Sequence, residues 1–137
     1  MLRYDLIHPP LLEALATAGH GSRLLIADGN YPYLTARNAS ARIIHLNLRP
    51  GLLTVPEVLS SIQTAVNFEA AVVMRAEDGD EPEAHRDYRR LLGPGVPLAR
   101  IDRFAFYEEV RSSDVGLVVA TGDERLYANL LLTVGLR

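Results

Sequence analysis

The sequence predicts an α/β fold, a three-layer sandwich in which helices cover both faces of a mainly parallel, mixed sheet. Segments with strand and helix patterns alternate along the whole chain, which is typical of parallel strands joined by crossover helices. The strand candidates are continuous apolar runs, as expected where both faces of a sheet are covered. The 137 residues contain no internal repeat and are expected to form one domain, residues 1–137.

Residues 7–18 are expected to form the first helix, because Leu11, Leu15 and Ala18 recur at helical spacing. Gly19 is expected to end this helix in the left-handed conformation, which glycine adopts easily. A short linker then leads into the first strand.

The remaining elements follow in alternation. Strands are expected at residues 23–27, 42–46, 70–74, 98–101, 115–120 and 130–136. Later helices are expected at residues 56–67, 82–92 and 102–112. The apolar C-terminal segment suits a strand or a helix, and we assign it as a strand. Asp102 stands where an N-cap is needed. The polar connection 29–40 is long, and long loops in small domains are often functional.

Composition excludes several classes of protein. The chain has no cysteine, which rules out disulfide frameworks and thiolate metal sites. A formal net charge of −3 argues against a nucleic-acid partner. No apolar run is long enough for a membrane span, and the start does not resemble a signal peptide, so we expect a cytoplasmic location. The four histidines share no metal-ligand spacing, so no metal is expected.

His20 and Asp28 are the first candidate site residues, one before and one after the first strand. A glycine-flanked histidine can exchange protons near neutrality, although an exposed linker histidine is the alternative. Asp28 can accept a hydrogen bond from an imidazole or a sugar hydroxyl, or it can simply belong to an Asp-Gly turn. The strand between them spans on the order of 20 Å. Either the linker folds back or a second subunit brings the two groups together.

Two later segments are also candidates. Arg103 precedes three aromatic residues and a carboxylate, and its planar fork of donors suits a polyol. Aromatic residues at helical spacing more often pack in a core, which is the alternative. Tyr127 and Asn129 are two residues apart, point the same way if the segment is extended, and suit hydroxyl recognition. A turn is the alternative there.

Taken together, these segments resemble the D-ribose pyranase / L-fucose mutarotase family. The matching residues, in family order, are Gly19-His20-Gly21, Asp28 with Pro32, Arg103-Phe104-Ala105-Phe106-Tyr107-Glu108, Thr121-Gly122 and Tyr127-Ala128-Asn129. The resemblance implies a non-hydrolytic isomerase of free reducing sugars that needs no cofactor. It implies that His20 is the catalytic acid and that the sugar is bound by Asp28, Arg103, Tyr127, Ala128 and Asn129.

The resemblance also favours one branch and an assembly. The ribose-type branch typically has histidine where Arg103 stands, so the chain looks closer to the L-fucose mutarotase branch. Family members form homodecamers of two pentameric rings, with sites between neighbouring subunits. The chain departs from the family pattern at Gly29, where alanine is usual, at Asp123, where glutamate is common, and in residues 33–40. The alternatives are a ribose-type pyranase, a non-catalytic sugar-binding module and a purely structural ring subunit.

Overall fold

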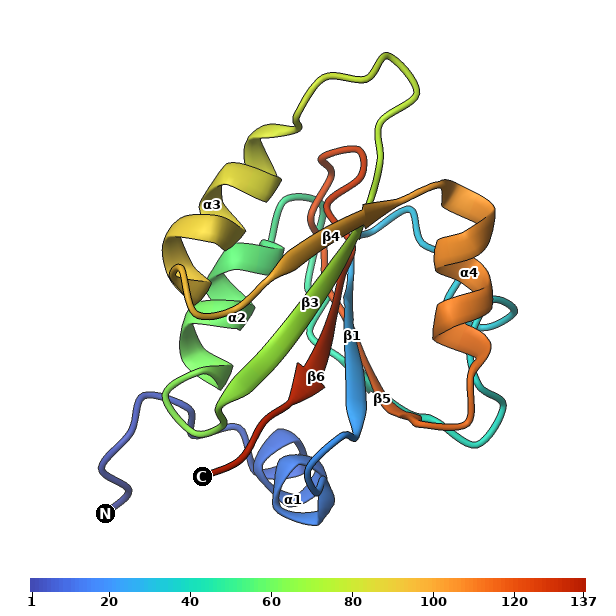
Figure 1. The fold of residues 1–137 in the computed structure, drawn as a ribbon. Coiled ribbons are helices and arrows are strands. Elements are labelled where there is room, and N and C mark those ends of the chain that lie inside the picture. Colours follow the sequence, from blue (N-terminus) through green and yellow to red (C-terminus); the bar gives the residue numbers. More distant parts are fainter.

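The computed structural model describes residues 1–137 and contains one six-stranded sheet with four helices (Figure 1). The helices are α1 (Pro9–Thr17), α2 (Val55–Ile62), α3 (Glu83–Leu92) and α4 (Arg103–Arg111). The strands are β1 (Arg23–Ala27), β2 (Arg42–His45), β3 (Phe68–Met74), β4 (Leu98–Ile101), β5 (Val115–Ala120) and β6 (Leu130–Val134). The predicted α/β class is confirmed, and none of the helices is long and apolar enough to cross a membrane.

The sheet is mixed because β6, the last strand in the sequence, runs antiparallel to the other five. The strand order is β2-β5-β1-β6-β3-β4, and β6 is antiparallel to both of its neighbours, β1 and β3. The pairs β1–β5, β2–β5 and β3–β4 are parallel. The carboxyl ends of five strands therefore lie at the end of the sheet where β6 begins. The assignment of the C-terminal segment as a strand is confirmed.

Both faces of the sheet are buried, which explains the continuous apolar strands. Leu24 and Ile26 of β1 join a core cluster beneath α1, α2 and α3, whereas Leu25 and Ala27 join a second cluster with α4. In Figure 1, α4 lies on the opposite side of the sheet from α2 and α3. Each fully buried leucine side chain contributes roughly 1.5–3 kcal/mol.

The connection between β1 and β2 is ordered and covers the sheet together with α4. Tyr31 is buried, and its hydroxyl donates to the carbonyl oxygen of Ala36 at 2.7 Å. The Asn38 amide donates to the carbonyl oxygen of Val115 at 2.9 Å, which ties the loop to the start of β5. The loop is thus part of the second core.

Two local expectations are wrong. The second helix ends at Ile62 and not at residue 67, since the Asn67 carbonyl oxygen accepts a bond from Gly135 beside the sheet. Gly19 is not left-handed; Gly21 is, with φ 81°, because the Gly21 N–H must turn to donate to the Val134 carbonyl oxygen.

Candidate active site

All predicted site residues except His20 lie at one end of the sheet. Asp28 directly follows β1, and Arg103 opens α4 just beyond β4. Residues 127–129 directly precede β6, which starts at this same end. His20 precedes β1 and therefore lies at the opposite end. Within one subunit the structure does not bring His20 to the others.

Asp28 and Asn129 form a buried, doubly bonded pair. The Asn129 amide nitrogen donates to Oδ2 of Asp28 at 2.7 Å, and the Asp28 backbone N–H donates to Oδ1 of Asn129 at 2.8 Å. The Asn30 N–H donates to the other carboxylate oxygen at 2.9 Å. Asp28 is 2% exposed and Asn129 is 3% exposed. Burial raises the pKa of Asp28 to about 6, against the opposing effect of the backbone hydrogen bonds.

Tyr127 does not lie in an extended segment, so the expected alternation of side chains is wrong here. Its φ is 61°, a left-handed conformation, and two side chains of α3 hold the carbonyl groups of residues 127 and 128. His85 Nε2–H donates to the Tyr127 carbonyl oxygen at 2.8 Å, and the Tyr88 hydroxyl donates to that of Ala128. Burial holds the pKa of His85 below its ordinary value. The helix α3 thus fixes the segment that carries Tyr127.

Arg103 is exposed and lies against aromatic rings. Its Nε–H donates to the Tyr107 hydroxyl at 3.0 Å, and its guanidinium lies 5.5 Å from the centre of that ring. Tyr107 in turn contacts Tyr31 edge-on, with ring centres 5.4 Å apart. No carboxylate pairs with Arg103, so its remaining donors are free for a ligand. Phe106 is fully buried, so for this aromatic residue the core-packing alternative is correct.

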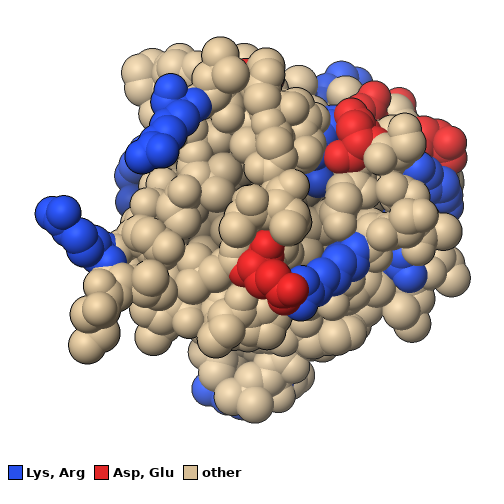
Figure 2. Space-filling model, turned by 90° about the horizontal axis from the view of Figure 1, so that it is seen from below, with Lys and Arg blue, Asp and Glu red and all other residues tan.

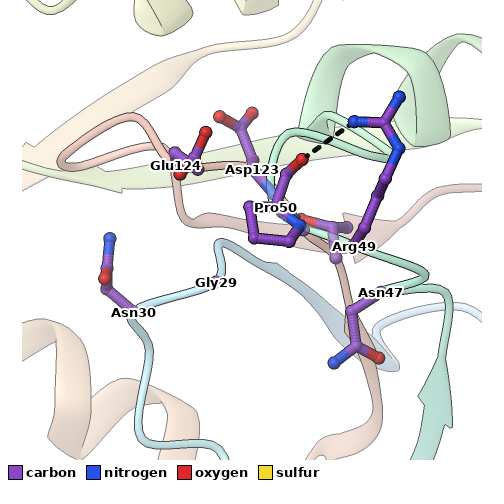
Figure 3. A pocket seen from close by; sticks show the side chains of 9 residues that line it. Gly29, Asn30, Asn47, Arg49, Pro50, Asp123 and Glu124 are labelled. Atoms are coloured by element: carbon purple, nitrogen blue, oxygen red, sulfur yellow. Dashed lines mark hydrogen bonds between the residues drawn. The ribbon is translucent and has the colours of Figure 1, made fainter.

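A polar hollow of about 450 Å³ adjoins Asp28 on the side of β5 and β2. None of its lining residues is hydrophobic; they are Gly29, Asn30, Asn47, Arg49, Pro50, Thr121, Gly122, Asp123 and Glu124. Figure 3 shows the side chains of Asn30 and Asn47 on opposite sides of Gly29, and Arg49 folded back onto the carbonyl oxygen of Pro50. Amides and an arginine around a polar hollow suit a hydroxylated ligand.

Asp123 anchors the strand-end loop, a role that sequence reasoning missed. Its carboxylate accepts two bonds from the Arg125 guanidinium, at 2.7 and 3.0 Å, and one from the Val55 N–H that begins α2. Although burial alone would raise it, these bonds hold the pKa of Asp123 below its usual value. Arg125 also reaches Asp87 of α3 at 3.4 Å. The only sequence signal was an aspartate three residues beyond the predicted strand 115–120.

At the opposite end, His20 Nε2–H donates to Oε2 of Glu69 at 2.9 Å. The two side chains are 52% and 45% exposed. Glu69 lies 49 positions away in the chain, and nothing in the local pattern pointed to it. Throughout the chain, no three or more histidine, aspartate or glutamate side chains gather closely enough to hold a metal ion.

Comparisons with known proteins agree with the fold. The model of the RbsD / FucU transport protein family matches residues 1–137. RbsD from Bacillus subtilis complexed with D-ribose has a TM-score of 0.86 and 21% identity over 100% of this chain and 99% of that chain; this likeness shows the fold alone. The fucose mutarotase from Streptococcus pneumoniae in complex with L-fucose has a TM-score of 0.80 and 26% identity, over 100% and 99%. FucU from Bifidobacterium longum has a TM-score of 0.79 and 29% identity, over 96% and 95%.

Proposed function

The chain belongs to the RbsD / FucU transport protein family, and on this premise we propose that it is a mutarotase acting on a free monosaccharide similar to L-fucose. The observation that carries the proposal is the cluster of Asp28, Arg103, Tyr127 and Asn129 at one end of the sheet. This cluster offers a carboxyl, a free guanidinium, a phenol and an amide, which are the groups that bind sugar hydroxyls. The related fucose mutarotase, whose solved structure contains L-fucose, supports this substrate class.

The reaction moves two protons and forms no lasting covalent bond to the protein. A proton from His20 reaches the ring oxygen while the anomeric hydroxyl loses its own, so the ring opens to the aldehyde. Rotation about the first carbon–carbon bond and reclosure with the reverse transfers give the other anomer. Asp28, with a pKa of about 6, suits the transfer at the anomeric hydroxyl near neutral pH. General acid–base catalysis of this kind contributes ~10²–10⁴-fold.

The proposed site lies between two subunits. His20 and Asp28 flank β1 at opposite ends, so a neighbouring copy must supply the histidine. Ile7 and Leu136 are exposed at the His20 end, and Phe104 and Leu126 are exposed at the other. Figure 2 views the His20 end, where several charged side chains gather at the upper right and the rest of the face carries few Lys, Arg, Asp or Glu side chains. When one end of each subunit binds the opposite end of the next, the subunits close into a ring. The assembly we propose is a decamer of two pentameric rings.

Saturation-transfer NMR on L-fucose, D-ribose and D-galactose tests the activity. We expect accelerated anomer exchange, fastest for L-fucose, and at least a tenfold loss in His20→Ala with the fold intact. Exchange between the pyranose and furanose forms of ribose would instead favour the ribose-type activity. Binding without exchange, unaltered by His20→Ala, would favour a sugar-binding module. No acceleration and no binding for any sugar refutes all three.

Mixed assemblies test the placement of the site. His20→Ala and Asp28→Asn chains are each expected to be nearly inactive. After joint unfolding and refolding at equal ratio, about a quarter of the sites should combine an intact histidine with an intact aspartate from two chains. Recovery of roughly that share of activity supports a shared site. Recovery of none, in assemblies shown to be mixed, places both residues in one subunit.

A further inference from the structure

We propose that Glu69 is the positioning residue of His20, and that the pair makes Nδ1 the ring nitrogen that exchanges protons with the sugar. The inference rests on the proposed mutarotase function. His20 Nε2 is occupied by the Glu69 carboxylate at 2.9 Å, whereas Nδ1 has no hydrogen-bond partner in the subunit. A histidine whose one nitrogen is held by a carboxylate works through the other nitrogen, because the carboxylate fixes both the tautomer and the ring orientation.

The sheet is built so that Glu69 faces His20. In the pairing of β3 with β6, Phe68 is opposite Val134 and Ala70 is opposite Thr133, so Glu69 is an extra residue in the ladder. Such a bulge turns one side chain away from the regular alternation. Gly135 adds the necessary space, since a Cβ there would lie only 3.3 Å from the Glu69 Cβ. A regular strand would not direct this carboxylate toward the histidine.

The histidine's own backbone is held at the same place. The Gly21 N–H donates to the Val134 carbonyl oxygen at 2.9 Å, and the Val134 N–H donates to that of Ser22 at 2.8 Å. The linker carrying His20 and the bulge carrying Glu69 are therefore both fixed to the end of β6. Because both side chains are about half exposed, their pairing adds little to folding. Its effect falls on the orientation of the imidazole.

A double-mutant cycle separates positioning from a general structural role. Glu69→Ala is expected to lower kcat for sugar exchange about tenfold with little change in KM, since the sugar is bound by the other end of a neighbour. Glu69→Gln keeps an acceptor for Nε2–H and should stay within about threefold of the wild type. Glu13→Ala removes a carboxylate from another exposed pair, with Arg42, and is the control expected to change nothing.

The decisive comparison is made in the His20→Ala background. If Glu69 acts through His20, adding Glu69→Ala to His20→Ala lowers the rate no further. An equal loss in both backgrounds, or no loss in either, overturns the proposal.

Ring-¹⁵N histidine NMR tests the contact without relying on activity. The His20 signals, identified by their absence in His20→Ala, are expected to change in Glu69→Ala and to stay unchanged in Glu13→Ala. A wild type that exchanges no sugar refutes the proposed function. Unchanged His20 signals in Glu69→Ala refute the pairing itself, whatever the activity.

Discussion

Asp28→Asn should change how the stability of the protein depends on pH. The wild-type carboxyl is buried, 2% exposed, so ionising it in the folded protein is unfavourable. Asparagine never ionises. The asparagine amide nitrogen would face the amide nitrogen of Asn129, so the hydrogen bond between the two side chains is lost at every pH. The loss of that bond is constant, whereas the titration of Asp28 is not, and the two effects can therefore be separated.

The magnitude follows from the shift of the Asp28 pKa from 3.8 in the unfolded chain to about 6 in the fold. Because this pKa is raised by folding, the contribution of Asp28 to stability is fully present below pH 3.8 and is lost as the pH rises through about 6. At 1.36 kcal/mol per unit of pKa, the difference of about 2 units corresponds to about 3 kcal/mol. The free energy of unfolding of the wild type should fall by that amount relative to Asp28→Asn across this window.

Urea unfolding followed by circular dichroism, at fixed protein concentration between pH 4 and 7.5, measures the difference. Asp123→Asn is the matched control. Because the Asp123 pKa is lowered below 3.8, its contribution to stability is present throughout this range and is lost only at lower pH, so the difference between wild type and Asp123→Asn should stay flat between pH 4 and 7.5. A difference between wild type and Asp28→Asn that does not vary with pH would contradict the assigned burial of the charge.

Three further substitutions test other parts of the site. Gly122→Ala places a Cβ against the carbonyl oxygens of Arg49 and Leu52 and should destabilise the fold by roughly 2–3 kcal/mol, whereas Gly116→Ala, with open space around it, should not. Urea unfolding midpoints of the two variants test this difference. Tyr88→Phe leaves the buried Ala128 carbonyl unpaired and should lower stability by about 1–3 kcal/mol and raise KM more than it lowers kcat; an unchanged KM would contradict its role. Arg103→Lys removes the planar donor fork and should raise KM about tenfold in steady-state exchange assays.

Much of the fold could be predicted because its signals are local. The β1 and β5 strands are continuous apolar runs, buried on both faces. Asp102 caps α4 as its position predicts, accepting bonds from two backbone N–H groups. The grouping of Asp28 with Arg103 follows from their places beyond parallel strands. In each case one short stretch of sequence carries the physical cause.

What could not be predicted depends on contacts between distant residues. Where β6 pairs in the sheet decides that Asn129 meets Asp28, 101 positions away, and no local pattern encodes this. The bulge at Glu69 exists only in relation to its partner strand. The ion pair of Asp123 with Arg125 is local, but its burial depends on where α2 and α3 pack.

The course of the antiparallel strand β6 has a consequence for assemblies that mix intact and defective chains. β6 begins at residues 127–129, the proposed sugar-binding segment, and ends beside His20, so one subunit takes part in two proposed sites. A chain that is defective both at His20 and at residues 127–129 inactivates both of the sites in which it takes part. If intact chains make up a fraction f of the pool, intact sites make up about f². A minority of defective copies would therefore depress activity out of proportion to its number, as a dominant-negative allele does.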